Sequence, residues 1–298
     1  MIKILITGSS GFIGKSIKEF FIKDNEYEVF SPSSKDLNLL NKIDVKKYLN
    51  ENKIDWIIHS ANHHWHPRDN KSKRIDDQLK NNLLMFLNLM DCRSLYQNII
   101  YFGSGGEVPR EYWNKEITES DIGKKLPDDP YGISKLLMDC FSHKYKNAYN
   151  LRLFGVCGEY DDWRFRFISN MCALAILNND LVINQDAIFD YLYVADLYKI
   201  LKFFINKQPE VSDYNISTGQ GIKLTEIARK VKKYSNRNLK VLLKNKEMGS
   251  TYIGSNKKFL KLSPEFKFTK IDKIIENIYE YLNKNEGTLN INEINIKK

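Results

Sequence analysis

The stretch KILITGSSGFIG, residues 3–14, joins a short apolar run to a turn that contains three glycines. The run of residues 3–7 predicts a buried strand, and the apolar positions after the turn recur at helical spacing, which predicts a helix. Backbone amides at the start of such a helix can hold a pyrophosphate. A tight turn that only packs the helix is the alternative, but we expect a dinucleotide cofactor at Gly8, Ser10, Gly11, Phe12, Ile13 and Gly14.

Apolar strands and helices alternate over the first half of the chain. Strands are predicted at residues 27–30, 56–59, 98–102 and around 151–154, and helices around 45–49, at 75–90 and from 131. This alternation is typical of a parallel sheet covered on both faces, so we predict an α/β fold with a Rossmann-type doubly wound parallel sheet. Residues 1–155 are expected to form the cofactor-binding domain. Residues 156–282 are expected to form mainly a smaller mixed α/β lobe, with some segments returning to the first domain, and residues 283–298 a polar, solvated tail.

The composition is that of a globular protein. The chain has 298 residues, of which 42% are hydrophobic and 28% charged, and these proportions exclude disordered and fibrous architectures. The net charge of +9 is scattered and not gathered in one arm, so nucleic acid is not the expected partner. Four cysteines without a CxxC pair indicate free thiols in a reducing compartment, and no apolar run is long enough to span a membrane. We expect a cytoplasmic protein with no membrane partner.

The residues after the second predicted strand bear on the choice of cofactor. An acidic residue at the end of this strand would bind the ribose 2′-hydroxyl of NAD, but the chain continues from Phe30 as SPSSK. Hydroxyls and a cation in place of a carboxylate suit a 2′-phosphate. Ser33, Ser34 and Lys35 therefore favour NADP(H), while NAD(H) stays possible and an ordinary solvated turn is the alternative.

Ser104, Tyr131 and Lys135 form the candidate catalytic group. Tyr131 and Lys135 are four residues apart and share one helix face, so the ammonium is expected to lower the pKa of the phenol from about 10. The phenol can then exchange a proton near neutral pH. Ser104 follows a buried strand, at the sheet edge where open α/β folds bind ligands, and is placed to hydrogen-bond the same substrate oxygen. A YxxxK spacing alone is common, but the order of glycine turn, strand-end serine and YxxxK is far more specific.

With these motifs in order, the chain resembles the extended short-chain dehydrogenase/reductase family of NAD(P)-dependent nucleotide-sugar epimerases, dehydratases and reductases. The resemblance covers residues 1–282 and is closest to GDP-fucose synthase-like enzymes and NDP-4-keto-6-deoxysugar reductases. Supporting stretches are DLNLL (residues 36–40), HSA (59–61), Asn82, DYLYVADL (190–197) and YNISTG (214–219). The resemblance implies a homodimer, a nucleotide-sugar-binding second lobe, and cofactor contacts from Leu39, Ser60, Ala61, Asn82, Tyr131, Lys135 and Leu153.

The resemblance also implies the roles of the catalytic group. In the family the nicotinamide exchanges hydride with sugar C4, the tyrosine transfers the proton, and the lysine contacts the nicotinamide ribose. These roles fall on Tyr131 and Lys135, with Ser104 beside the reacting oxygen.

Two glycines narrow the expected reaction. Dehydratases of the family carry an Asp-Glu pair directly after the serine, where this chain has Gly105 and Gly106. Gly106 also replaces the cysteine with which fucose synthase epimerises C3 and C5, and the matching histidine falls near Arg166. We therefore expect NADPH-dependent C4-keto reduction of a nucleotide-diphosphate 4-keto sugar for surface polysaccharide. An NAD-dependent C4 epimerase is the alternative, and a non-catalytic nucleotide-binding regulator is the alternative outside the enzymes.

Several side chains are candidates for the substrate pocket, each with a plainer interpretation beside it. The HHWH loop at residues 63–66 is expected either to line the site through His63 and His64 or to lie on the surface, and we expect no metal there. Glu107 is either a pocket carboxylate or a charged turn residue. Arg164 and Arg166 either pair with the substrate diphosphate or belong to a charged helix N-terminus.

Three further positions concern the sugar. Gly105 is expected against the substrate. Cys157 stands near the place where the family often has YGP, and it either lines the sugar pocket or is a buried apolar thiol. Phe189 precedes Asp190 where family members usually have Arg, so the anchor for the diphosphate at that point stays open.

Overall fold

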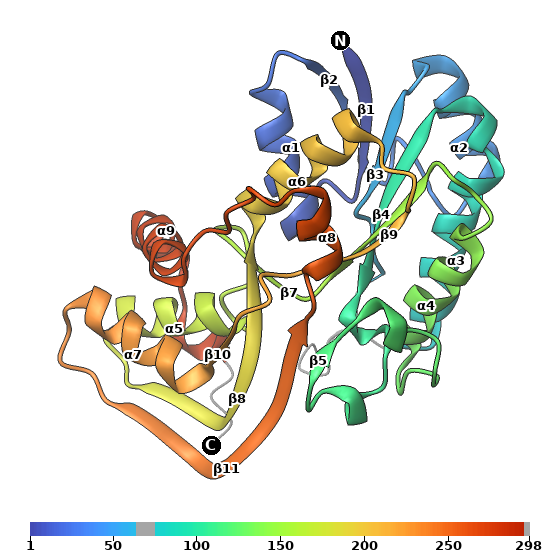
Figure 1. Ribbon diagram of the computed structural model, residues 1–298. Coiled ribbons are helices and arrows are strands. Elements are labelled where there is room, and N and C mark those ends of the chain that lie inside the picture. Colours follow the sequence, from blue (N-terminus) through green and yellow to red (C-terminus); the bar gives the residue numbers. More distant parts are fainter. Residues whose placement is uncertain (64–74, 295–298) are drawn as a thin grey trace. The chain divides into compact units, whose positions relative to one another are not determined.

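The structure of the protein, a computed structural model, describes residues 1–63 and 75–294 (Figure 1). The chain divides into two compact units. The first comprises Met1–Tyr112, Thr118–Leu153 and Leu197–Ile216, and the second comprises Trp113–Ile117, Phe154–Asp196 and the chain from Ser217 on. Residues 197–216 therefore return to the first unit after the chain has entered the second.

A six-stranded parallel sheet lies in the middle of the first unit, in the order β2-β1-β3-β4-β6-β9 (Figure 1). Ile4, Ile57 and Ile100 are fully buried, as expected of strands that are covered on both faces. The order of the strands reverses at β1, so ligands are expected at the carboxyl ends of β1 and β3. The predicted fold class is confirmed. The strands are β1 (Ile2–Thr7), β2 (Tyr27–Phe30), β3 (Trp56–His59), β4 (Asn98–Ser104), β6 (Ala148–Leu153) and β9 (Asp213–Ile216).

Helices cover both faces of this sheet (Figure 1). On one face the rings of Phe20 in α1 and Tyr198 in α6 stack with their centroids 5.2 Å apart. On the other face Val45 of α2, Phe86 of α3 and Met138 of α4 belong to one buried cluster with residues of β1, β3 and β4. Burying one such side chain contributes about 1.5–3 kcal/mol, so both layers are firmly attached to the sheet. The helices are α1 (Phe12–Ile22), α2 (Lys42–Asn52), α3 (Ile75–Asp91), α4 (Pro130–Ser142) and α6 (Val194–Lys207).

The second unit contains a smaller mixed sheet in the order β10-β8-β11-β5, with β7 beside β8. β8 runs antiparallel to β10 and parallel to β11 and β7. Ile274, Ile275 and Ile278 are buried on one face of α9, which packs against α5. The strands are β5 (Glu116–Ile117), β7 (Gly155–Cys157), β8 (Leu181–Tyr193), β10 (Gly221–Lys223) and β11 (Val241–Gly254), and the helices are α5 (Phe167–Ile176), α7 (Leu224–Ser235), α8 (Lys257–Leu262) and α9 (Ile271–Lys284).

The tail after α9 differs from its expected form. It contains two short 3₁₀ helices, Glu286–Thr288 and Ile291–Glu293, and the side chains of Leu289 and Ile294 are buried. Apolar residues among the Asn and Lys of this stretch attach it to the protein, so the described part of the tail is not wholly solvated. Among the described residues, none of the helices combines the length and the apolar character needed to cross a membrane.

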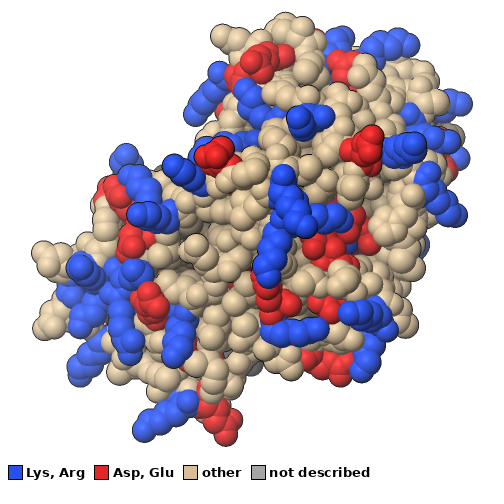
Figure 2. Space-filling model, in the orientation of Figure 1, with Lys and Arg blue, Asp and Glu red and all other residues tan. Residues whose placement is uncertain are grey.

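Figure 2 shows both signs of charge spread over the visible face. Lys and Arg gather most densely over α7 and β11, at the lower left. In α7 the ammonium of Lys230 lies 3.0 Å from the Asp272 carboxylate, so part of this basic group is paired.

Candidate active site

The glycine turn joins β1 to α1 in a conformation that only glycine adopts easily. Gly8 has φ +69°, and a Cβ there would lie 2.6 Å from Cα of Ala61. A Cβ on Gly14 would lie 2.2 Å from the carbonyl oxygen of Gly8. Because the helix and the end of β3 lie this close to the turn, a side chain at Gly8 or Gly14 would clash with the backbone. The fold itself therefore requires glycine at both positions.

Gly11 differs from the other two glycines. A Cβ on Gly11 would meet only ordinary contact, 3.5 Å from the carbonyl oxygen of Gly8. Gly11 is the N-cap of α1; its φ is −82°, none of the described side chains caps the helix, and the first turn has no acidic residue. The amides of Phe12, Ile13 and Gly14 therefore begin the helix without a side-chain acceptor. A pyrophosphate fits this cradle, since a backbone without side chains lies at the positive end of a helix dipole.

The chain after β3 lies against the same turn. The amide of Ala61 donates to Oγ1 of Thr7 at 3.3 Å, and Nδ1 of His59 lies 2.9 Å from that oxygen. A Cβ on Gly8 would also lie 2.8 Å from the carbonyl carbon of Ser60, so both expected cofactor residues, Ser60 and Ala61, adjoin the turn. Burial and the nearby Lys135 ammonium lower the pKa of His59 to about 3, so this histidine is neutral.

Asn82 of α3 holds the start of the histidine loop. Its Oδ1 accepts the amide of His63 at 2.6 Å, and Asn81 lies 3.4 Å from Nδ1 of His63. The expected substrate residue His64, with Trp65 and His66, lies outside the described residues.

The turn after β2 holds a carboxylate that sequence analysis did not place there. Both the amide and the hydroxyl of Ser33 donate to Oδ2 of Asp36, at 3.2 Å and 2.6 Å. These bonds lower the pKa of Asp36. Ser34 and Lys35 are exposed. Ser33 thus donates to Asp36 while its side chain stays exposed, and its contact with a phosphate stays a prediction.

The side chain of Leu39, an expected cofactor residue, is buried in the core cluster with residues of α2 and α3, and its carbonyl accepts Nδ2 of Asn88 at 2.8 Å. Leu37 belongs to the same cluster, so the alternating leucines of DLNLL anchor this loop in the core. The contact of Leu39 with the cofactor stays a prediction.

Ser104 and Tyr131 are brought together by a close contact between η2 (Gly105–Glu107) and the start of α4. Asp129 caps α4 by accepting the amide of Gly132 at 2.8 Å, and Pro130 opens the helix. A Cβ on Gly132 would lie 2.3 Å from the carbonyl oxygen of Gly106, so glycine alone permits this approach.

The space at Gly106 shows how near the two side chains are. A Cβ placed on Gly106 would lie 3.3 Å from Oγ of Ser104 and 3.8 Å from Cε1 of Tyr131. Both side chains are half-buried. A hydroxyl and a phenol therefore border the same small volume, at the carboxyl end of β4. Leu153, another expected cofactor residue, pairs in register with Ser104 at this edge.

Lys135 lies beneath Tyr131 and is buried. Its Nζ donates to the carbonyl oxygen of Phe102 at 2.8 Å and lies 5.6 Å from the centroid of the Tyr131 ring. Burial lowers the pKa of Lys135 to about 8, and the carboxylate of Glu107 acts in the opposite direction. The three residues predicted as the catalytic group thus form one site within the first unit.

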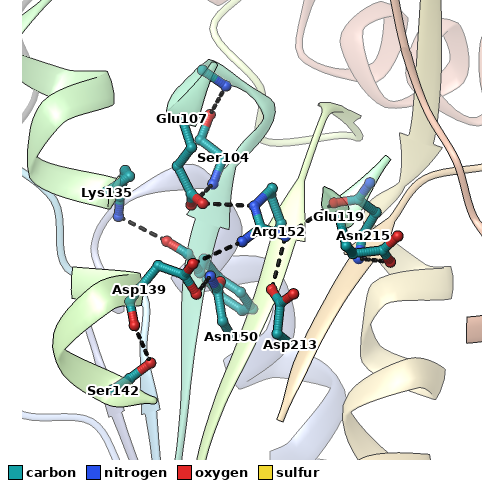
Figure 3. A network of polar contacts seen from close by, with 12 residues as sticks. Ser104, Glu107, Glu119, Lys135, Asp139, Ser142, Asn150, Arg152, Asp213 and Asn215 are labelled. Carbon is teal, nitrogen blue, oxygen red and sulfur yellow. Dashed lines mark hydrogen bonds and ion pairs between the residues drawn. The ribbon is translucent and has the colours of Figure 1, made fainter. Parts of the chain in front are cut away.

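Glu107 is the charged turn residue of the second interpretation, but it is not exposed. Its side chain is fully buried; Oε1 accepts the amide of Ser104 at 2.9 Å, and Oε2 accepts Nε of Arg152 at 2.6 Å (Figure 3). It is therefore a buried and paired residue of the turn rather than a carboxylate open to the pocket, and Gly105 in the same turn is buried as well. The cause of the burial is Arg152, which was not among the residues predicted for the site. An arginine in the middle of the apolar strand NLRLF was the available signal.

The candidate residues of the second unit make local contacts. Arg164 pairs with Asp162 at 2.7 Å, and Arg166 pairs with Asp161 at 3.2 Å, while both arginines remain exposed. Cys157 is buried, its Sγ contacts the carbonyl oxygen of Leu192 at 3.6 Å, and burial raises the pKa of its thiol. This is the buried thiol of the second interpretation.

Asp190 is a structural residue. Its carboxylate accepts the amides of Thr218 and Gly219 at 3.0 Å and 2.7 Å and is fully buried. Among the described residues, no three side chains of His, Cys, Asp or Glu are grouped to hold a metal ion.

Comparison with known proteins agrees with this geometry. The NAD dependent epimerase/dehydratase family matches residues 4–217. The chain belongs to this family. It is 27% identical over 295 residues to GDP-6-deoxy-D-talose 4-dehydrogenase of Aggregatibacter actinomycetemcomitans, covering 93% of this chain and 97% of that protein. It is 26% identical over 257 residues to GDP-L-colitose synthase of Yersinia pseudotuberculosis, covering 78% and 81%.

Solved structures share the fold over nearly the whole chain. GDP-L-fucose synthetase from Naegleria fowleri bound to NADP superposes with a TM-score of 0.83 at 19% identity, covering 96% of this chain and 94% of that one. MlghC, a GDP-mannoheptose C4 reductase from Campylobacter jejuni with NADP bound, gives 0.80 at 18% identity, covering 94% and 98%. The predicted family and enzyme class are confirmed: this member of the epimerase/dehydratase family is an NAD(P)-dependent oxidoreductase of the extended short-chain type.

Proposed function

We propose that this enzyme reduces the C4 keto group of a nucleotide-diphosphate 4-keto hexose or heptose with NADPH, in the synthesis of a surface polysaccharide sugar. The observation that carries the proposal is the shared volume at Gly106, bordered by Oγ of Ser104 and the ring of Tyr131, with the Lys135 ammonium beneath. Two relatives are named for GDP-linked sugars, GDP-6-deoxy-D-talose and GDP-L-colitose, and they support a nucleotide-sugar substrate.

Each residue of the site has one role in this reaction. When bound, the reduced nicotinamide supplies the hydride for C4. Tyr131 donates its phenolic proton to the oxygen at C4, and the hydroxyl of Ser104 hydrogen-bonds that oxygen and orients it. Lys135 holds a positive charge under the ring of Tyr131 and stabilises the phenolate that remains.

Within the described residues, the turn Gly105–Glu107 that borders this volume offers the substrate no further acid or base, which favours reduction alone. Removing water or inverting C3 and C5 requires a further acid and base beside the sugar. Gly105 and Gly106 carry no side chain, and Glu107 holds both of its oxygens on Ser104 and Arg152. The carboxylate in this turn therefore cannot reach a substrate.

The proposal extends to NADP(H), to a cytoplasmic enzyme and to a homodimer. Lys35 is exposed in the turn after β2, where it can meet a 2′-phosphate, and NADP is bound in two of the similar structures. All four cysteines, which lie within the described residues, are free thiols, as a reducing compartment favours.

Arg164 and Arg166 are proposed to bind the substrate diphosphate after exchanging their aspartate partners.

The test is incubation with NADPH and a panel of enzymatically prepared GDP-, dTDP-, CDP- and UDP-linked 4-keto sugars. We expect loss of NADPH absorbance with at least one of them, and a product whose NMR spectrum shows a hydroxyl at C4 with C3 and C5 unchanged. NADPH binding without oxidation by any member of the panel would instead indicate a nucleotide-binding regulator.

One observation favours a second candidate, an NAD-dependent C4 epimerase. The Asp36 carboxylate, bonded to Ser33, lies in the turn where a 2′-phosphate would bind and would repel it. The same catalytic group can oxidise and then reduce C4 if the nicotinamide stays bound. Copurified NAD that does not exchange, with interconversion of C4 epimers and no net use of NADPH, would support this reaction over reduction.

A further inference from the structure

We propose that Glu107, held by Arg152, is a positioning residue that fixes the backbone of Ser104 and keeps Lys135 protonated. The inference rests on the proposed function, because it assigns these effects to the reacting site. It concerns a buried carboxylate that touches neither substrate nor cofactor.

The contacts of Glu107 tie it to the catalytic strand. The side chain of Ser104 accepts the amide of Gly106 at 3.1 Å, while the amide of Ser104 donates to Oε1 of Glu107 at 2.9 Å. This reciprocal pair fixes Ser104 from both sides, as a capping box does. Gly103 makes room for the arrangement, since a Cβ there would lie 2.4 Å from Oε1 of Glu107.

Arg152 does not require Glu107 for its own neutralisation. Its guanidinium also lies 2.8 Å from the Asp213 carboxylate and 3.3 Å from the Asp139 carboxylate (Figure 3). Both of these acids lie away from Ser104. The burial of a third carboxylate is costly unless it has partners. We therefore infer that the Glu107 carboxylate does more than pair with Arg152: it accepts the amide of Ser104 and stabilises the charge of Lys135.

The electrostatics of Lys135 point to the same residue. Burial draws the pKa of this lysine down to about 8, and Glu107 is the group that raises it again. Of the other described groups near Lys135, His59 of β3 is neutral, Tyr131 of the same helix presents its ring, and Asp139, four residues further along α4, pairs with Arg152. Arg152, behind Glu107, carries a positive charge. Without the Glu107 carboxylate, Lys135 would lose its proton at a lower pH.

Glu107→Gln tests the charge. Glutamine keeps the length and an oxygen for the amide of Ser104, so the main change is loss of the negative charge. The titration of Lys135 is followed by NMR of the protein with ¹³C-labelled lysine, with the Cε signal assigned from Lys135→Met. We expect the midpoint to fall by at least about one pH unit, because a nearby charge in a low-dielectric site has an effect of this size.

Asp213→Asn is the matched control, since it also removes one acid from Arg152 but on the side away from the site. It should leave the Lys135 midpoint in place. An unchanged midpoint in Glu107→Gln, or an equal fall in Asp213→Asn, would overturn the charge role.

Glu107→Asp tests the positioning of Ser104 and keeps the charge, so it preserves folding if Glu107→Gln does not. The shorter side chain cannot reach both the amide of Ser104 and Nε of Arg152. We expect kcat to fall about tenfold or more with KM nearly unchanged, because only the orientation of the reacting oxygen is lost. Wild-type kcat in a folded Glu107→Asp protein would overturn this role.

The NMR titration and the kinetic measurement distinguish a failure of the role of Glu107 from a failure of the proposed function. The NMR titration needs no substrate, so it stands if no 4-keto sugar is reduced. The kinetic arm uses whichever substrate the wild-type protein turns over. If the wild-type protein turns over a substrate, Glu107→Gln should also shift the basic limb of its pH–rate profile downward by the same amount as the lysine midpoint.

Discussion

Nζ of Lys135 lies 2.8 Å from the carbonyl oxygen of Phe102, two residues before Ser104 on the same strand. A single bond thus joins the first turns of α4 to the strand that carries the serine, and it gives the buried ammonium one firm acceptor. Burial disfavours the charged form of Lys135, so holding this charge lowers the stability of the fold. The site requires the charge in spite of that cost.

Lys135→Met should therefore stabilise the protein while it removes activity. Burial lowers the pKa of Lys135 from 10.5 to about 8. At roughly 1.4 kcal/mol per pKa unit this corresponds to a cost of about 3 kcal/mol at pH 7, of which about 1 is returned by the bond to Phe102. Urea unfolding at pH 7 should show a gain of about 2 kcal/mol for the variant.

The stability gained by Lys135→Met should depend on pH. Below pH 8 both the folded and the unfolded chain hold the proton on Lys135, and the folded state bears the full cost. Between about pH 8 and pH 10.5 the folded state has released the proton and the unfolded state has not, so this group's contribution to stability rises with pH. The advantage of the variant should shrink across that window. An advantage that grows there would contradict the assignment of the charge.

Tyr131→Phe should separate catalysis from cofactor binding. The substitution removes only the hydroxyl that donates the proton, and the ring that borders the Gly106 volume remains. We expect turnover to fall by about a hundredfold or more. NADPH affinity, measured by fluorescence titration, should change by less than about twofold. Retention of most activity would refute Tyr131 as the acid.

Gly11→Ala should weaken cofactor binding without harming the fold. The new Cβ would make an ordinary 3.5 Å contact, and the φ of −82° suits alanine. The weaker helix cap and the lower entropy of the unfolded chain nearly cancel, at about 0.5–1 kcal/mol each. The methyl group would occupy the face that a pyrophosphate approaches, so NADPH affinity should fall about tenfold or more.

Two other glycines serve as comparisons for this variant. Gly14→Ala should lower the melting temperature, because its Cβ would lie 2.2 Å from a backbone oxygen. Gly287→Ala, with open space around its Cβ, should change neither property. Equal NADPH affinity in Gly11→Ala and wild type would place the cofactor elsewhere.

Arg152→Met should be among the most destabilising single changes in the first unit. It leaves the carboxylates of Glu107, Asp139 and Asp213 facing one another without their shared cation. Removing one partner of a buried ion pair costs about 3–5 kcal/mol. Arg164→Met breaks an exposed pair instead and should cost at most about 1 kcal/mol. Similar urea midpoints for the two variants would contradict the importance of the buried network.

Periodicity predicted the first unit well because its signals are local. The strand at residues 56–59 agrees at both ends, and the helices at residues 75–90 and from 131 agree to within a residue. Tyr131 and Lys135 share a face by helix geometry, and Ser104 reaches them because parallel strands end at one edge.

The sequence did not reveal contacts between distant segments. Glu107 follows Ser104 in a polar turn and gives no local sign of burial. Its state depends on Arg152, 45 residues later, in a neighbouring strand. Asp36 was missed for a shorter-range reason, since the turn folds back and brings its carboxylate to Ser33. Glu107 finds its partner through tertiary structure and Asp36 through a local turn, and no period in the sequence records either contact.

Lys35→Ala should test the choice between the two cofactors. The exposed ammonium of Lys35 lies in the turn after β2 and would pair with a 2′-phosphate, which NADPH carries and NADH lacks. Loss of one charge-assisted contact corresponds to about fivefold weaker NADPH binding, with NADH binding unchanged. Asp36→Asn should act in the opposite direction, since it removes the carboxylate beside Ser33 and with it the repulsion of the phosphate. Lys47→Ala, an exposed lysine of α2, is the control for general loss of positive charge. If Lys35→Ala weakens both cofactors equally, or neither, the turn does not select NADPH and the epimerase with bound NAD becomes the better assignment.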